Sequence, residues 1–387
     1  MQKHTSYPIF LAFLCMGFGD VVGPLTSQLQ NDYQLSNLAA GLVTFMGFIM
    51  FGLLSVPMSI YQARTSKKHV LQLGLLAALL GMIIPMVSGF NSFALVLTGL
   101  LLLGTGATLL QVAGNPIMRD ISTEGRYSSN LSFGQFIKAI GSLSGALIPI
   151  LAAKMFGLDW KILFPIYSAF ILLVVVYLYF THIEEQAPPA DEKPASFSSC
   201  LSLLKDSRVA PMVFGIFLYV GAEVSMSSKL PNYLQTAFDF DIKQTGLFGT
   251  LFFFFSLMVG RFLGGFILRT MAPQRFLQIS ILASLAGTLG LFAAPNYTLG
   301  FACIGLIGLG FANVFPLIFS ITIDRMPHKS NEISGLMVTA IIGGAIVPVL
   351  FGWVADTFGL LSGFVVTIIS FVYLFMIAIK REKKEAV

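Results

Sequence analysis

Charged side chains inside otherwise apolar segments are the residues of this chain best placed to do chemistry. Five of them fall well within such segments, namely Asp20, Lys138, Glu223, Lys229 and Arg261. An ionised side chain at the centre of a bilayer costs at least about 2.5–3.5 kcal/mol, so each one needs a partner or a water-filled cavity. A carboxyl group in a low-dielectric cavity favours its neutral form. Asp20 and Glu223 are therefore the candidates for carrying a coupling proton.

Amide side chains form two short polar stripes. The stretch "LLQVAGNPIMRD" carries Gln111 and Asn115 four residues apart, and Gln135 lies three residues before Lys138, so each pair occupies one face of a helix. Amides both donate and accept hydrogen bonds, as a site for a hydroxyl-rich molecule requires. Counting at about 1.5 Å per residue from the helix ends places Gln111 and Lys138 at one depth. The two stripes are predicted to face one cavity; the alternative is that the amides only join neighbouring helices.

Proline and glycine residues mark expected points of bending and close packing. Pro116 leaves the carbonyl of Val112 without its usual helix bond and so permits a bend. Gly264 and Gly344 belong to glycine pairs that are typical of close helix packing. Arg261, inside "MVGRFLGGFILRT", is nearer the cytoplasmic edge, and a gating contact between helices is expected there rather than substrate binding.

Structural alternatives stay open for the acids. Asp20 is a candidate for a buried ion pair with Lys138, and Glu223 for a fixed pair with Lys229 or Lys138. Lys229 lies nearer the outer end of its segment, from which its side chain can extend toward the interface.

The composition is that of an integral membrane protein. Of 387 residues, 56% are hydrophobic and only 11% are charged, and the mean hydropathy is +0.84, whereas soluble domains are about 25% charged. Apolar runs long enough to cross about 30 Å of hydrocarbon recur along the chain. Twelve spans are predicted, at 8–29, 38–63, 70–89, 93–117, 131–153, 161–181, 209–234, 244–268, 276–294, 299–322, 333–355 and 361–380.

The distribution of Lys and Arg predicts the orientation. If both termini are cytoplasmic, the outer loops hold only Lys154, Lys161 and Lys243, and the inner segments hold all the other Lys and Arg outside the spans. This asymmetry is the positive-inside pattern. The start "MQKHTSYPIF" runs into the first span without a cleavage site, so we expect a retained helix. The expected location is the bacterial cytoplasmic (inner) membrane.

Metal, cofactor and enzyme chemistry find little support in the sequence. Cys15, Cys200 and Cys303 give neither a disulfide framework nor metal-ligand spacing, and all four His residues fall in loops. We therefore expect no metal and no bound cofactor, and the net charge of +5 requires no nucleic acid. A membrane-embedded enzyme would need a catalytic cluster that the loops lack, so no enzyme is predicted.

The chain divides into two similar halves. A polar stretch rich in Pro and acidic residues separates six spans from six, and it predicts domains at 1–182 and 208–387 joined by a cytoplasmic linker at 183–207. The fifth span carries "GSLSGALIPIL" and the eleventh "AIIGGAIVPVL", with Gly and Pro in register. These features predict an all-α membrane protein of twelve transmembrane helices in two six-helix bundles, the major facilitator fold.

Several motifs resemble the fucose:proton symporter family of the major facilitator superfamily over nearly all twelve spans. They are "GDVVGPLTSQLQ" with Asp20, "GTGATLLQVAGNPI", "NLSFGQFIKAIGSL", "FLYVGAEVSM", "GRFLGGFIL", "FANVFPLIFS" with Asn313, and "GGAIVPVLFGWVAD". The resemblance implies uptake of a monosaccharide coupled to proton entry. It also implies that Asp20, Gln111, Gln135 and position 138 line the site, and Asn313 joins Asn115 as a further sugar-binding candidate.

Two departures from that family bear on the substrate. Gln111 stands where the fucose transporter has Glu, and Lys138 stands where the pattern has Asn. A fixed cation at this level favours an acidic sugar such as a uronate or sialic acid, unless Asp20 or Glu223 neutralises it. We expect a neutral sugar (fucose-, glucose- or galactose-like) or an amino sugar first and an acidic sugar second.

The resulting hypothesis is rocker-switch symport by a monomer in the lipid bilayer. Asp20, helped or replaced by Glu223, takes up the proton, and sodium is the other possible coupling ion. A drug or metabolite exporter of the same superfamily is the main rival among transporters, although polar stripes favour a hydrophilic cargo. A sensor that binds its ligand without moving it is a further alternative.

Overall fold

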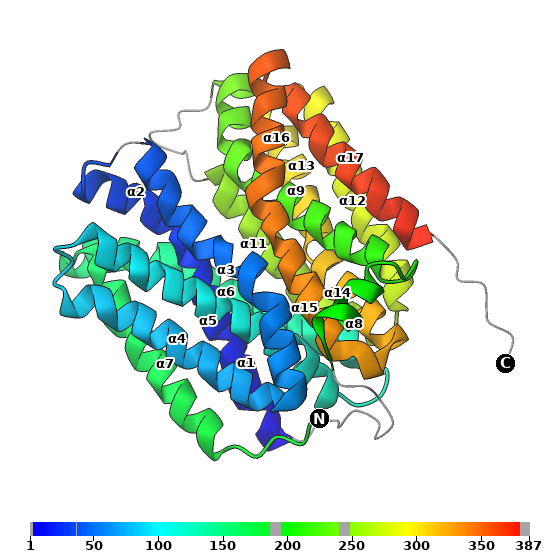
Figure 1. Cartoon of the computed structure of the whole chain (residues 1–387). Helices are drawn as coiled ribbons and strands as arrows, with labels where there is room; N and C mark the ends of the chain where they lie inside the picture. Colours follow the sequence, from blue (N-terminus) through cyan, green and yellow to red (C-terminus); the bar gives the residue numbers. More distant parts are fainter. Residues whose placement is uncertain (1–2, 36, 186–194, 240–247, 380–387) are drawn as a thin grey trace, which may run out of the picture. The chain divides into compact units, whose positions relative to one another are not determined.

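The structure is a computed structural model that describes residues 3–35, 37–185, 195–239 and 248–379, and within these ranges the chain is largely α-helical (Figure 1). The first eight helices are α1 (Lys3–Phe18), α2 (Val22–Asp32), α3 (Asn37–Arg64), α4 (Lys67–Val87), α5 (Phe93–Asp120), α6 (Tyr127–Phe156), α7 (Leu163–Phe180) and α8 (Phe197–Leu203). The others are α9 (Ala210–Phe238), α11 (Phe248–Ile267), α12 (Pro273–Ala293), α13 (Tyr297–Phe311), α14 (Val314–Arg325), α15 (Ser330–Thr339), α16 (Gly343–Phe358) and α17 (Leu360–Ile379). Part of the predicted linker, the outer-loop residue Lys243 and the basic C-terminal end from Lys380 lie outside the described residues.

The long apolar helices are those of a multi-pass membrane protein. Within the described ranges, ten helical stretches are long and apolar enough to cross a membrane. Two parts of α6, Tyr127–Gly145 and Leu147–Phe156, meet at 41° and bring the number to eleven when they are counted as one bent span. Tyr7–Val21 is a shorter apolar helix. The predicted fold class, an all-α membrane protein, is confirmed.

Residue contacts group the chain into two compact units. The first comprises Met1–Asp206 with Ile323–Ile342, and the second comprises Ser207–Thr322 with Gly343–Val387. The segment from Ile323 to Ile342 therefore packs with the N-terminal helices, although it belongs to the C-terminal half by sequence. The division at 1–182, 183–207 and 208–387 describes internal similarity along the chain and stays a prediction.

The helices of two predicted spans are interrupted by short turns where candidate site residues lie. The span expected as continuous over 8–29 is interrupted by a 3-10 turn, Gly19–Val21, that carries Asp20. A side chain on Gly19 would lie 2.6 Å from Ala107 of α5, so this turn needs glycine there. Asn313 likewise lies between α13 and α14. Irregular backbone at membrane depth is tolerated where protein or a cavity surrounds it.

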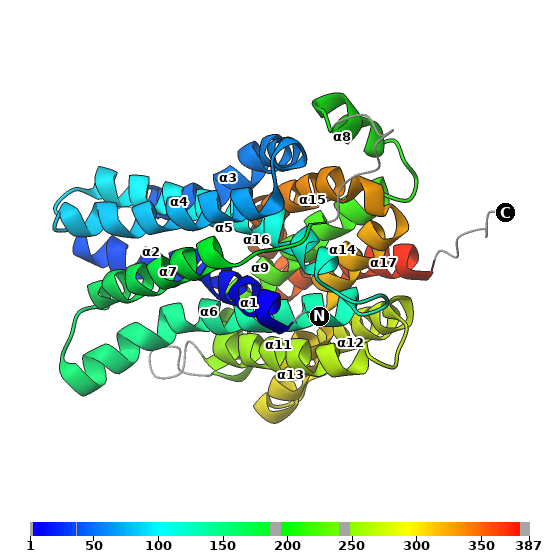
Figure 2. The same ribbon diagram turned by 90° about the horizontal axis from the view of Figure 1, so that it is seen from below.

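Local capping and close packing fix the helices of the first unit. Ser66 begins α4 by accepting a hydrogen bond from the backbone N–H of His69. Helices α4 and α5 lie side by side in both views (Figure 1; Figure 2). Their backbones approach so closely that a side chain on Gly81 would come 2.6 Å from the carbonyl oxygen of Gly99. Small residues at such contacts are the usual means of packing helices in membranes.

Candidate functional site

An acid, a cation and a hydroxyl meet in the first unit. The Nζ atom of Lys138 lies 3.3 Å from Oδ2 of Asp20, and the hydroxyl of Ser142 donates a hydrogen bond of 2.6 Å to the same oxygen. The Asp20 side chain is 41% exposed, whereas that of Lys138 is 14% exposed. The group therefore combines opposite charges with access from outside the protein interior.

Two glycines bring these side chains together. Gly17 of α1 and Gly141 of α6 face each other so closely that a Cβ on Gly17 would lie 2.2 Å from the carbonyl oxygen of Lys138. A Cβ on Gly141 would lie equally close, 2.2 Å, to the carbonyl oxygen of Leu14. Asp20 follows Gly17 by about one helical turn. The close contact at Gly17 therefore places the Asp20 carboxylate beside the α6 face that bears Lys138.

The two predicted amide stripes also meet. The Nε2 atom of Gln135 donates to Oδ1 of Asn115 over 3.4 Å, which joins α6 to α5. Asn115, Gln135 and Gln111 are all buried, with exposures of 0%, 2% and 4%. The Nδ2 group of Asn115 has no acceptor among the residues that the structure describes. A buried amide donor without an acceptor is costly, and a ligand hydroxyl would satisfy it.

The face of α6 organises this chemistry. Gln135, Lys138 and Ser142 lie at positions i, i+3 and i+7, which share one face of a helix. An amide, an ammonium and a hydroxyl thus follow one another along α6, with Asp20 opposite the last two. The arrangement suits a polar, hydroxyl-bearing ligand together with one exchangeable proton.

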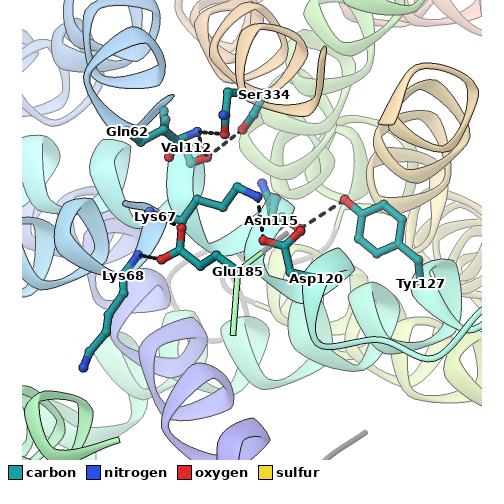
Figure 3. A network of polar contacts seen from close by, with 10 residues as sticks. Gln62, Lys67, Lys68, Val112, Asn115, Asp120, Tyr127, Glu185 and Ser334 are labelled. Carbon is teal, nitrogen blue, oxygen red and sulfur yellow. Dashed lines mark hydrogen bonds and ion pairs between the residues drawn. The ribbon is translucent and has the colours of Figure 1, made fainter. Parts of the chain in front are cut away.

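The carbonyl freed by Pro116 is not left without partners. The hydroxyl of Ser334 in α15 donates to the Val112 oxygen over 2.7 Å, and Nε2 of Gln62 in α3 donates to it over 3.4 Å (Figure 3). Helix α5 continues past Pro116 to Asp120. The sequence predicted the orphan carbonyl, and the structure adds the two side chains that satisfy it.

A polar network links the start of α4 to the end of α5. Lys67 pairs with Asp120 at 2.5 Å, and both side chains are almost fully buried, at 5% and 2% exposure. The carboxylate of Glu185 accepts hydrogen bonds from the backbone N–H groups of Lys67 and Lys68 at the start of α4 (Figure 3). An acid at a helix N-terminus satisfies donors that the helix itself leaves free.

The second unit contains its own ion pair. Oε1 of Glu223 in α9 lies 3.8 Å from Nη2 of Arg261 in α11, and Arg261 also donates to the Ala312 carbonyl over 3.3 Å. Within the second unit, the partner of Glu223 is therefore Arg261 of the neighbouring helix and not Lys229, which was one of the two alternatives; the other alternative, Lys138, belongs to the first unit and stays a prediction. Arg261 thus contacts α9 and the residue that directly follows α13.

The remaining candidates lie at helix contacts of the second unit. Asn313 donates to the Gly260 carbonyl over 2.7 Å, and a Cβ on Gly264 would collide with the Asn313 amide at 2.3 Å. A Cβ on Gly344 would meet the side chains of Val220 and Val224 at 3.1 and 3.2 Å. The Asn313 side chain thus binds the backbone of α11. A role for Asn313 in binding substrate stays a prediction.

Sequence reasoning missed the residues that partner the candidates. Ser142 was detectable, because it continues the α6 face that begins at Gln135. Gln62 and Ser334 carried no local signal, since they lie 50 and 222 residues from the Val112 oxygen they bind. Among the described residues no three His, Cys, Asp or Glu side chains are grouped to hold a metal ion.

Comparison with known proteins identifies close architectural relatives. A family model described as Major Facilitator Superfamily matches residues 9–341. The chain is 28% identical over 380 residues to the glucose/galactose transporter of Brucella abortus, covering 94% of this chain and 90% of that protein. It is 28% identical over 404 residues to the L-fucose-proton symporter of Escherichia coli, covering 92% and 89%. The crystal structure of FucP, a transporter in the outward conformation, matches 97% of this chain and 98% of that one, with a TM-score of 0.84 at 23% identity.

Proposed function

The chain belongs to the major facilitator superfamily, and from this premise we propose that it imports a monosaccharide together with a proton by alternating access. The resemblance to the fucose:proton symporter family that the sequence motifs indicate is confirmed by the relatives. Those relatives carry the names of a glucose/galactose transporter and an L-fucose-proton symporter. Transport of a sugar, rather than catalysis, is the activity that the site chemistry supports.

One observation carries the proposal: an exposed carboxylate, an ammonium and a hydroxyl lie beside a pair of buried amides on α5 and α6. Asp20 shares its Oδ2 atom between Lys138 and Ser142, and Asn115 is bonded to Gln135. We assign the proton to Asp20, because its side chain is the more exposed of the two intramembrane acids, 41% against 18% for Glu223. The amides are assigned to sugar hydroxyls.

The state of Lys138 supports a neutral or amino sugar as the substrate. The Asp20 carboxylate lies 3.3 Å from the ammonium, so the pair carries no net charge for a ligand to match. An acidic sugar is the second candidate, since its carboxylate would take the place of Asp20 beside Lys138 when Asp20 holds a proton.

Further parts of the assignment are proposals on the same footing. We place the protein in the bacterial inner membrane with both termini in the cytoplasm, which the distribution of Lys and Arg supports. A monomer is proposed, with the proton gradient as the energy source and sodium as the rival coupling ion. No cofactor enters this scheme.

Uptake into proteoliposomes tests the proposal. An inward proton gradient is imposed, and labelled neutral, amino and acidic sugars are offered with and without a protonophore. The expected result is accumulation of a neutral or amino sugar that the protonophore abolishes. Accumulation that depends on a sodium gradient and is unchanged by the protonophore would mean that sodium, not the proton, is the coupling ion. Uptake of none of the sugars would overturn the proposed function.

A further inference from the structure

The carbonyl oxygen of Val112 is held from outside its own helix. Pro116 has no N–H to offer it, and the hydrogen bonds from Ser334 and Gln62 take that place (Figure 3). All three interacting groups are buried, with Ser334 and Val112 fully inaccessible and Gln62 2% exposed. A buried backbone carbonyl needs a partner, so removing the shorter bond, from Ser334 at 2.7 Å, leaves this oxygen only the 3.4 Å bond from Gln62.

Helix α15 packs against α3 as well as α5 within the first compact unit. Gln62 uses its amide group twice, because Nε2 also donates to Oδ1 of Asn331 over 3.0 Å. Directly after Ser334, a Cβ on Gly335 would come 2.3 Å from the Ser59 hydroxyl. The hydroxyl of Ser334 therefore reaches Val112 across a close, glycine-mediated contact of α15 with α3.

The same contact carries a built-in cost. The Oε1 atom of Gln62 is buried and has no hydrogen-bond partner among the residues described. An unmet buried acceptor weakens the packed arrangement relative to any other in which that oxygen finds a donor. Such a balance suits a contact that has to break and form again.

We propose that Ser334 and Gln62 are positioning residues that latch α15 to the Val112 carbonyl and thereby set the turn of α5 that bears Gln111 and Asn115. Val112 lies directly after Gln111 and three residues before Asn115, so the latch and the amide stripe share one turn of helix. Departure of α15 removes the shorter of the two bonds to the Val112 carbonyl, and this turn of α5 then relaxes. The inference deepens the proposed function and rests on it for the sugar, but the latch itself is measurable without transport.

The native residue Cys200 can report whether α15 is packed against α3. It lies in α8, which packs on both α3 and α15, and it is 1% exposed. Burial, reinforced by the carboxylate of Glu332 in α15, raises the pKa of the Cys200 thiol to about 11. Because the thiolate is the form that reacts, a maleimide labels Cys200 slowly while α15 is seated and faster once it leaves.

The first experiment compares maleimide labelling of Cys200 in the purified full-length protein, read from the mass of its peptide. Ser334→Ala is expected to speed labelling about three- to tenfold, the effect of one lost buried hydrogen bond. Ser334→Thr keeps the hydroxyl and is expected to restore slow labelling. Ser55→Ala is the matched control, because the buried Ser55 hydroxyl donates to the Phe51 carbonyl of its own helix.

A double-mutant cycle isolates the bond to Val112. Pro116→Ala restores an N–H that can donate to the Val112 carbonyl inside α5, so Ser334→Ala in that background is expected to change labelling less than about twofold. An equal effect of Ser334→Ala in the wild-type and the Pro116→Ala backgrounds would overturn the latch. So would unchanged labelling in both Ser334→Ala and Gln62→Ala.

Sugar binding gives the second readout. Ser334→Ala is expected to change the apparent KM more than kcat, because the positioned amides bind sugar in the ground state, and Ser334→Thr is expected to restore it. Faster labelling of Cys200 with an unchanged KM would mean that Ser334 makes a packing contact and does not position the sugar-binding amides. Failure of the wild-type protein to take up any sugar would instead overturn the proposed function, while the labelling result would stand.

Discussion

Each compact unit carries one intramembrane acid paired with a base, but the two pairs are built differently. Asp20 and Lys138 lie 3.3 Å apart, and the carboxylate is 41% exposed and accepts a hydrogen bond from Ser142. Glu223 and Arg261 lie 3.8 Å apart with exposures of 18% and 9%, and Arg261 also holds a backbone carbonyl. The acid of the first pair is therefore more than twice as exposed as the acid of the second.

We expect this difference to distinguish a coupling site from a structural one. A carboxylate that water reaches can exchange a proton during each cycle, whereas a guanidinium that is anchored to the backbone fixes the acid beside it. Motion of the Arg261 side chain would give up the bond to Ala312 as well as the ion pair. We therefore expect the first unit to carry proton coupling and the second to depend on its pair for stability.

The largest expected effect follows replacement of the accessible acid. Asp20→Asn should abolish accumulation of sugar against its gradient, because the side chain can no longer carry a proton, while exchange of labelled for unlabelled sugar continues. Proton-driven uptake and counterflow in proteoliposomes measure the two activities. Asp159→Asn is the control, since Asp159 pairs with Lys161 at 3.6 Å outside the candidate site. Uphill accumulation by Asp20→Asn would remove the coupling role.

The less exposed pair should respond in stability rather than in coupling. Glu223→Gln leaves the Arg261 charge buried without its acid, and breaking a buried pair in this way costs up to about 3–5 kcal/mol. A lower apparent Tm is expected in detergent, with partial recovery in the double variant Glu223→Gln, Arg261→Met. If Glu223→Gln instead abolished accumulation at unchanged Tm, the comparison would be reversed and coupling would lie in the second unit.

A smaller effect is expected at the buried amides. Gln135→Ala removes the bond to Asn115 and one predicted sugar contact, so the apparent KM should rise about two- to tenfold, the value of one neutral hydrogen bond. Initial-rate uptake measures it. Gln278→Ala is the control, because this amide in α12 donates to the Ala378 carbonyl. A rise of equal size in both variants would mean that the Gln135 amide has no special part in binding sugar.

The fold was predictable because its causes are local. Apolar runs of membrane-spanning length and the positive-inside pattern depend only on neighbouring residues, and the confirmed helical architecture followed from them. The short turns at Asp20 and Asn313 were missed, since a single interrupted turn leaves the hydropathy of a span unchanged. The grouping of Ile323–Ile342 with the first unit is a property of packing that the chain order does not contain.

The site was predictable only as far as helix periodicity reaches. Gln135 and Lys138 were assigned to one face from their spacing, and the structure places them there on α6. Partners across helices depend on which faces meet, so Arg261, which was expected to make a gating contact, was not foreseen as the partner of Glu223. The freed carbonyl of Val112 followed from Pro116, whereas its donor Ser334 did not.

The smallest expected effect also decides the substrate class. An ion pair as exposed as that of Lys138 with Asp20 contributes about 0.2–1 kcal/mol, so Lys138→Asn should change uptake of a neutral sugar by no more than about fivefold. Binding of an acidic sugar depends on the cation and should be lost. Parallel uptake of both sugar classes by Lys138→Asn and by the control Lys154→Asn, a lysine near the end of α6, measures the difference. If only an acidic sugar is transported by the wild type and Lys138→Asn abolishes it, Lys138 is the carboxylate anchor. The ion pair with Asp20 then holds Lys138 only while no substrate is bound, and it does not remove the Lys138 charge from the binding site.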